Sequence, residues 1–318
     1  MKKYWEIVKN YFPIFGFVLV VLFFAIATKG AILKADSLQS LLSQVMLTAL
    51  VSIGSVFIFG AGCFDMSMGG TVCMSAVVGG YVGIATGSLF LMALACLAVA
   101  LVLNILKGIF ASYVEVPLFI VTIVLGSILS ALVLVMMGKE TTIFLNSAAN
   151  PVPTFSSLQL TVLNLAALGL YYLLCVVLFN YTGLGREIKL LGGSPVTFRQ
   201  TGLSAVKVKM TAFIVGAIGV ALSAFILLMR TRTVGSTTAS SMGTDVMVAL
   251  VLGGMPLSGG PRSRISAGLL GAATITVLNA GLTMLGLGQA PIQICRAVIY
   301  LGVVYVASMT YRTNLLPR

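Results

Sequence analysis

Polar and ionisable side chains are scarce in this sequence. Its 318 residues include no histidine and only seven Asp and Glu, and charged residues make up 8% of the chain. An ordinary soluble domain carries roughly 25% charged residues, so this composition excludes a water-exposed surface of the usual kind. A soluble enzyme, a secreted disulfide scaffold and a disordered chain are therefore all excluded.

Motifs for catalysis, metal binding and nucleotide binding are also missing. The five cysteines form no C-x-x-C pair, and most lie in apolar runs where a free cysteine behaves as a small hydrophobic residue. There is no cluster of metal ligands and no G-x-x-x-x-G-K-[ST] phosphate loop. We predict a protein that is not an enzyme and that has no metal and no cofactor of its own.

Long hydrophobic runs are what the sequence has in abundance. Hydrophobic residues make up 59% of the chain, and a helix that crosses a bilayer needs about 20 of them. The runs predict an all-α integral membrane protein, one domain over 1–318, with about ten transmembrane helices. The predicted spans are 12–28, 41–60, 70–87, 89–110, 118–137, 160–181, 210–229, 246–257, 265–285 and 292–309.

The first span could instead be a cleaved signal peptide, because Ala25-Ile26-Ala27 resembles a cleavage site. We favour a retained helix, since the run is long, rich in aromatic residues and followed by many more spans.

Basic residues predict the orientation. The net charge is +12, but the Lys and Arg are scattered between apolar runs without a basic stripe, which argues against nucleic-acid binding. With the N-terminus inside, most of them fall on the cytoplasmic side, as the positive-inside rule requires. The inner set is Lys2, Lys3, Lys9, Lys107, Arg186, Lys189, Arg199, Lys207, Lys209, Arg262, Arg264, Arg312 and Arg318. Both termini are then cytoplasmic, the loop 138–159 is extracytoplasmic, and 183–209 is cytoplasmic.

Glycines at regular spacing predict close helix packing. Gly79, Gly83 and Gly87 recur every four residues, a spacing that lets two helices approach closely. The contact could lie within one subunit or between two, and we favour the first. Gly253 and Gly254 interrupt the short eighth span. They open a glycine-rich turn that could bind an anion through backbone N–H groups, although close packing of a broken helix is the favoured interpretation.

Four polar residues lie within or next to the predicted spans. Asp65 and Ser67 either belong to a gate in a translocation path or cap the third helix, and we favour the cap. Asn104 and Asn279 either contact a solute or form hydrogen bonds between helices, and we favour the latter.

Five segments of the chain match a set of known motifs. FDMSMG at 64–69 resembles I-D-L-S-V-G, VPLFIVT at 116–122 resembles V-P-A-F-I-V-T, and VLNAGL at 277–282 resembles V-L-N-N-G-L. The segment from Gly185 to Gly202 resembles G-R…G-G-N-P-x-A-A-R-x-S-G, and the segment 251–260 resembles V-L-G-G-T-S-L-S-G-G. Through these motifs together the chain resembles the membrane permease subunits of ribose-type carbohydrate ABC importers. Thr197-Phe198, Ala280, Met255 and Pro256 depart from these patterns and leave the substrate open.

The resemblance implies partners and a mechanism. It implies a bacterial inner-membrane protein that forms a pore with a second permease, either a copy of itself or a paralogue. A separate ATPase would bind ATP and Mg²⁺, and an extracytoplasmic solute-binding protein would deliver a sugar or a sugar-like solute. Transport would proceed by alternating access. A nucleoside-type ABC permease and an ion-coupled secondary transporter are the alternatives, and the lack of histidine and paired acids disfavours the second.

The stretch 193–202 is predicted to be a short cytoplasmic helix that docks on the ATPase. Ser194 is a good N-cap, Pro195 a good first residue, and Gly202 is placed to end the helix. We predict that Phe198 enters an apolar slot on the ATPase and that Arg199 pairs with its acids. The coupling residues are then Gly193, Ser194, Pro195, Phe198, Arg199, Gln200 and Gly202. The alternative is an amphipathic turn that rests on the membrane surface.

Overall fold

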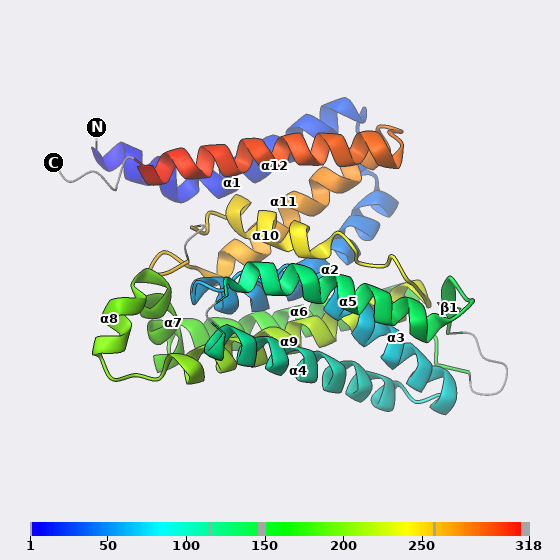
Figure 1. The fold of residues 1–318 in the computed structure, drawn as a ribbon. Coiled ribbons are helices and arrows are strands. Elements are labelled where there is room, and N and C mark those ends of the chain that lie inside the picture. Colours follow the sequence, from blue (N-terminus) through cyan, green and yellow to red (C-terminus); the bar gives the residue numbers. More distant parts are fainter. Residues whose placement is uncertain (1, 115, 146–150, 257–258, 313–318) are drawn as a thin grey trace.

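Helices that run roughly side by side make up almost the whole molecule (Figure 1). The computed structural model of the chain describes residues 2–114, 116–145, 151–256 and 259–312, with the side chains of residues 13–288, 290–302 and 305 within these ranges. The elements are α1 (Lys2–Ala27), η1 (Ala31–Leu33), α2 (Ala35–Gly60), α3 (Met68–Thr86), α4 (Leu89–Tyr113), α5 (Leu118–Met137), β1 (Thr142–Phe144), α6 (Ser157–Asn180), α7 (Gly183–Gly193), α8 (Pro195–Gln200), α9 (Ala205–Thr231), β2 (Thr233–Gly235), α10 (Met242–Leu252), α11 (Ile265–Met284) and α12 (Gln289–Arg312).

The centre of the bundle is the crossing of α2 and α9. Their backbones meet where a Cβ on Gly54 would lie 3.0 Å from the Gly216 Cα, so neither helix could carry a larger residue there without moving. Tyr171 of α6 reaches the same point and donates a hydrogen bond to the Val215 carbonyl at 2.9 Å. Glycines at the crossing thus allow the two helix backbones to approach closely, as small residues do between membrane helices in general.

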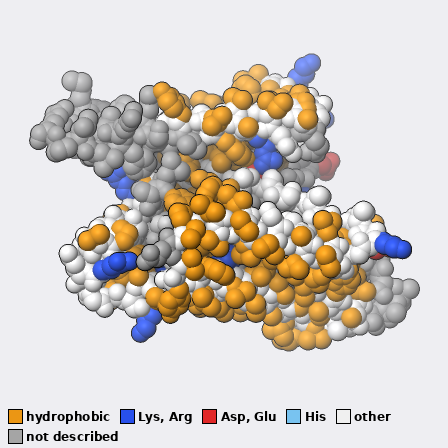
Figure 2. All heavy atoms as spheres, in the orientation of Figure 1, with side chains coloured by type: hydrophobic (Ala, Val, Ile, Leu, Met, Phe, Trp, Pro, Cys, Tyr) orange, Lys and Arg blue, Asp and Glu red, His pale blue; other side chains and the backbone are white. Residues whose placement is uncertain are grey.

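An exposed apolar surface, of the kind that faces lipid, surrounds this centre. Helices α4, α5 and α6 expose most of their apolar side chains, while α2 and α9 are mostly buried. Figure 2 shows hydrophobic side chains spread over the face that α4 and α5 form, with Lys and Arg placed mainly toward the ends of the helices. On the other side α1 packs against α11, where Phe24 lies over Gly281. That contact joins the first helix to the rest of the bundle.

The prediction of about ten transmembrane helices is only partly supported. Each predicted span coincides with a helix, but seven helices in the described residues are long and apolar enough to cross a bilayer, namely α2, α3, α4, α5, α6, α9 and α11. The eighth predicted span is wrong in its bounds, because α10 begins at Met242 and ends just before Gly253. Its 11 residues rise by about 16 Å, roughly half of the hydrocarbon core.

The glycine predictions have different outcomes. A Cβ on Gly79 would overlap Cys96, and one on Gly83 would lie 2.9 Å from the Met92 sulfur, so both pack against α4 in the same subunit. Gly87 ends α3 in a left-handed conformation, with φ of 65°. Gly253 packs against the Ala267 backbone, and a Cβ on Gly254 would lie 2.7 Å from Pro13.

The predicted loop 138–159 is more ordered than its composition indicated. Its residues 142–144 form β1, which pairs antiparallel with β2 just after α9, with Ile143 opposite Val234. Residue Ser156 begins α6 with a capping box completed by Gln159. A strand of three residues leaves too short a pattern to recognise, and its partner lies about 90 residues away.

Candidate functional site

A polar cavity opens between α3, α5 and the segment 236–241 that connects β2 to α10. Its volume is about 270 Å³, close to the roughly 300 Å³ at which small-ligand sites begin. The lining residues come from α3 and its approach, from α5, and from the connector: Met66, Gly69, Gly70, Cys73, Ile123, Gly126, Ser127, Ser130, Val133, Ser236, Thr238 and Ser240. The lining thus combines five hydroxyl groups with apolar and glycine surface and carries no charged side chain.

The connector is non-helical backbone that runs from β2 to α10 (Figure 1). Non-helical backbone at membrane depth must be buried in protein or line a cavity, and Ser236, Thr238 and Ser240 of this segment line the cavity. Ala239 takes φ of 60°, and its carbonyl lies so close to Gly69 that a side chain there would overlap it. The Thr238 hydroxyl accepts a hydrogen bond from the Gly235 N–H at 2.8 Å and turns the chain. We therefore regard 236–241 as a shaped wall of the cavity.

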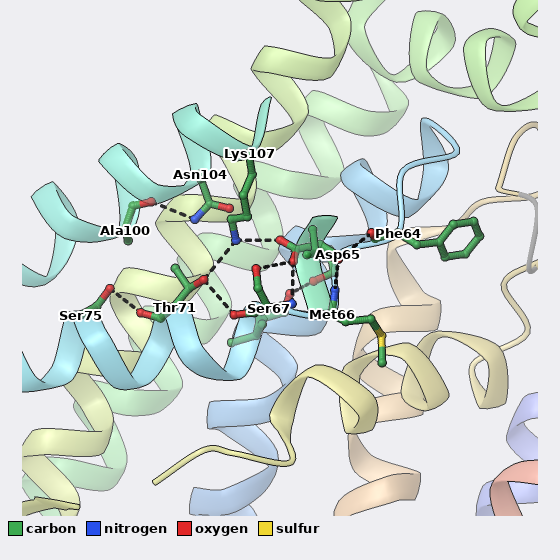
Figure 3. Close-up of polar contacts among 12 residues, drawn as sticks. Phe64, Asp65, Met66, Ser67, Thr71, Ser75, Ala100, Asn104 and Lys107 are labelled. Carbon is green, nitrogen blue, oxygen red and sulfur yellow. Dashed lines mark hydrogen bonds and ion pairs between the residues drawn. The ribbon is translucent and has the colours of Figure 1, made fainter. Parts of the chain in front are cut away.

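A buried ion pair lies between α4 and the start of α3. Lys107 of α4 donates to the Asp65 Oδ2 at 2.7 Å and to the Thr71 hydroxyl at 3.1 Å, and the side chains of Lys107 and Asp65 are fully buried (Figure 3). The Asp65 Oδ1 accepts from the Ser67 N–H at 2.8 Å and from its hydroxyl at 2.7 Å. The pair therefore fastens the start of α3 to α4.

The sequence predictions for these residues were incomplete. Ser67 is the N-cap residue of α3 but makes no capping bond with its side chain, because its hydroxyl points to Asp65. Lys107 was counted as a cytoplasmic loop charge, and this is wrong, since it lies inside α4 and is buried. Asn104 is one turn away from Lys107 and donates to the Ala100 carbonyl of its own helix at 2.8 Å. It forms no bond between helices.

A second polar cluster joins α10, α11 and α12, and the sequence analysis missed its centre. Asp245 forms an ion pair with Arg296, and its Oδ1 also accepts from the Tyr300 hydroxyl at 2.6 Å. Asn279 donates to the other carboxylate oxygen at 3.5 Å. Asn279 thus joins two helices, as predicted. The available signal was one acid and one arginine within separate apolar runs, at positions where an unpaired charge would be costly.

The predicted coupling helix is present, but one of its side chains has a different role. α8 spans Pro195–Gln200, with Ser194 as N-cap accepting from the Thr197 N–H at 3.2 Å and with Gly202 at φ of 74° just beyond its end. Phe198 is fully buried in the core of this chain, so the prediction that it enters a slot on a partner is wrong for this structure. Arg199, Gln200 and the apolar Val196 face outward instead.

Glycine backbones connect α7 and the loop after α10 to the end of α2. Gly192 of α7 packs against the Gly60 carbonyl at the end of α2, and Gly259 packs against Phe59 and Gly60. The Gly260 N–H donates to the Gly60 carbonyl at 3.0 Å, so this N–H is not available to an anion. We call these four residues, Gly60, Gly192, Gly259 and Gly260, the glycine junction. Leu257 and Ser258 of the predicted turn lie outside the described residues.

The cysteines stay separate. All five are free, and four of them are buried. Burial raises the pKa of the Cys63 thiol, between α2 and α3, to about 11, so this thiol is protonated at neutral pH. Within the described residues, no group of three or more Cys, Asp or Glu side chains could hold a metal ion.

Comparison with known proteins identifies the class of the fold. Residues 37–308 match the family described as the permease component of branched-chain amino acid transport systems. The chain belongs to this permease family. The permease is 28% identical over 284 residues to the ribose import permease protein RbsC of Escherichia coli K12, covering 85% of each chain. It is 25% identical over 339 residues to the xylose transport system permease protein XylH of Haemophilus influenzae, covering 86% of this chain and 89% of that one.

A solved structure supports the architecture. An ABC transporter assigned to the metal-chelate type, in an inward-facing conformation, matches with a TM-score of 0.56 at 15% identity. The match covers 93% of the permease and 98% of that chain. The permease is thus homologous to sugar ABC importer permeases and has an ABC permease fold, as the resemblance implied.

Proposed function

We propose that the permease is the membrane subunit of an ATP-driven importer and that a sugar or sugar-like solute crosses through the cavity beside the connector. The observation that carries this proposal is the lining of the cavity, with hydroxyls on α5 and on the connector and no charged side chain. A polyhydroxylated solute can exchange its water for these donors and acceptors. An amino acid would bring two charges into a site without a charged partner, which is costly.

The partners follow from the family and its sugar-importer relatives. A separate ATPase binds ATP and Mg²⁺, a second permease, identical or paralogous, completes the pore, and an extracytoplasmic binding protein delivers the solute. The whole chain 1–318 acts as one permease domain in a bacterial inner membrane, surrounded by lipid and with both termini in the cytoplasm. Apart from Lys107, the basic residues of the predicted inner set support this orientation.

Coupling runs from the ATPase through α7 and α8. The exposed Val196, Arg199 and Gln200 meet the ATPase, while the buried Phe198 ties α8 to its own subunit. When the ATPase displaces α7 and α8, the glycine junction transmits that movement to the end of α2 and to the loop after α10. These backbones are in direct contact. Displacement of the helices then opens the cavity to one side of the membrane or the other.

Blocking the cavity tests its role. Ser130→Phe is expected to abolish uptake of radiolabelled ribose or xylose in cells whose own gene carries the change, because the ring fills the space beside the connector. The matched control is Leu132→Phe, an exposed position of α5 that does not line the cavity. We expect both variants to reach the membrane at the wild-type level. Normal uptake by Ser130→Phe at normal abundance would remove the cavity from the path.

A charge reversal on α8 tests the coupling surface. Val196→Asp with Arg199→Glu is expected to abolish uptake and co-purification with the ATPase while leaving the amount in the membrane unchanged, because both side chains are exposed. Lys139→Glu, a reversal on an exposed residue after α5, serves as the control. Co-purification that survives the double change would show that α8 does not bind the ATPase.

The ion-coupled alternative predicts a different energy source. Each buried acid of the two clusters is already paired with a base, which leaves no free carboxylate there to carry a coupling ion. Proteoliposomes that hold the assembled permease pair and its ATPase, with the binding protein outside, should take up solute only when ATP is enclosed on the side of the ATPase. Uptake driven by a proton or sodium gradient without ATP would overturn the proposal.

A further inference from the structure

The second polar cluster lies directly beside the connector. Asp245 is one turn into α10, and its Oδ2 accepts from the hydroxyl of Ser241, the N-cap residue of α10, at 3.0 Å. Ser241 follows Ser240, which lines the cavity. On its other oxygen, Asp245 is held by Arg296 and Tyr300 of α12. A series of hydrogen bonds therefore runs from α12 through Asp245 to Ser241, which is joined by one peptide bond to the cavity-lining Ser240.

The two α12 residues are locked to each other as well as to Asp245. Arg296 donates from Nε at 3.2 Å and from Nη2 at 3.1 Å to the Tyr300 hydroxyl, which in turn donates to Asp245. One arginine and one phenol thus fix a single position of the carboxylate. On the same helix Ile294, Val298 and Leu301 are exposed, so the polar pair faces the bundle and the apolar side chains face away from it.

The start of α10 also contacts a second part of the cavity lining. Gly243 packs so closely on the Met66 carbonyl that a side chain there would overlap it, and Met66 lines the cavity. In Figure 1, α10 lies between α12 and the helices that surround the cavity. A shift of Asp245 therefore moves both Ser240 and the contact with Met66.

We propose that Arg296 and Tyr300 are positioning residues for the cavity: by holding Asp245 they fix the connector 236–241 and set the affinity for the solute. The assignment of this cavity to the solute rests on the proposed function. Neither residue touches the cavity, so both act through Asp245 and Ser241. A merely structural role would instead fasten α12 without any effect on the connector.

Tyr300→Phe is the mildest test, because it removes one hydroxyl and keeps the ion pair. In cells whose own gene carries the change, with ribose and xylose as probes, we expect KM to rise about tenfold, as for a lost hydrogen bond to a charged group, with Vmax nearly unchanged. Val298→Ala, on the exposed face of α12, is the matched control and should leave both constants unchanged. A normal KM in Tyr300→Phe would overturn the proposal.

A double change separates positioning from folding. Arg296→Leu alone leaves an unpaired buried carboxylate and should lower the amount of permease in the membrane. Asp245→Leu with Arg296→Leu removes both charges, so the amount should recover, because apolar replacement of a buried pair is often neutral. The positioning role predicts a raised KM in this double variant, since Asp245→Leu removes the acceptor of Ser241. Full recovery of KM together with the amount would show a structural role only.

A direct probe of the connector does not depend on the identity of the solute. Ser240→Cys, in a permease whose five cysteines are replaced by serine or alanine, reacts with a small water-soluble thiol reagent through the cavity. We expect its labelling rate to change in Tyr300→Phe and in the double variant but not in Val298→Ala. An unchanged rate would overturn the positioning role even if ribose and xylose proved not to be substrates. A changed rate with no uptake of either sugar would support the positioning role and would exclude ribose and xylose as the solute.

Discussion

Lys107→Met is expected to remove most of the folded permease from the membrane. The substitution leaves the carboxylate of Asp65 fully buried with only Ser67 as a donor, because Lys107 is its one ionic partner in the described residues. Breaking a buried pair on one side costs about 3–5 kcal/mol, a large part of the stability of an ordinary domain. Quantitative immunoblots of membranes and thermal unfolding of purified protein measure the loss.

The double variant Asp65→Asn with Lys107→Met is the control for this expectation. It removes both charges and keeps an oxygen that can accept from the Ser67 N–H and hydroxyl. We expect most of the lost protein to return, since the cost of the single variant is that of an unpaired charge. Equal losses in the two variants would show that the contacts of the lysine chain, and not its charge, hold α3 to α4. Uptake by the recovered double variant then reports whether the pair also acts in a gate.

Gly259→Ala is expected to cost several kcal/mol and to abolish transport. Gly259 has φ of 68°, which for alanine costs roughly 1–2 kcal/mol, and its Cβ would also overlap the Phe59 carbonyl. Overpacking of this kind adds about 1–3 kcal/mol. The backbone of α2 cannot yield locally, because the Gly60 carbonyl accepts from Gly260 in the same junction. Thermal unfolding of the purified protein and ribose uptake measure both effects.

Alanine substitutions at two other glycines distinguish the cost of the left-handed backbone from the cost of the close contact. Gly202 has φ of 74° with nothing within 4 Å of an added Cβ, and Gly62 has φ of 77° with only an ordinary contact at 3.7 Å. Alanine at either position should cost only the roughly 1–2 kcal/mol of the left-handed conformation. If Gly259→Ala were no more destabilising than these, the junction would not be a tight contact.

The class and much of the local structure of this protein follow from its sequence alone. Apolar runs long enough for a bilayer predicted the helices of the bundle, because in lipid every backbone group must be bonded within its own segment. The short helix α8 was also predictable, because Ser194, Pro195 and Gly202 are local signals that need no distant partner. Likewise the four-residue spacing of Gly79 and Gly83 was enough to predict close packing.

Only the tertiary structure decided which polar residues meet and which apolar residues are covered. Lys107 and Asp65 are 42 positions apart, and Asp245 and Arg296 are 51 apart, so no local pattern could pair them. Phe198 is an apolar residue in a polar stretch, which is equally typical of a docking residue and of an anchor, and only its neighbours in space make it an anchor. The cavity depends on α10, which is only about half as long as a transmembrane helix, and on the non-helical connector that lines the cavity. Helical periodicity describes one face of one segment, whereas pairing, burial and cavities depend on how distant segments pack against each other.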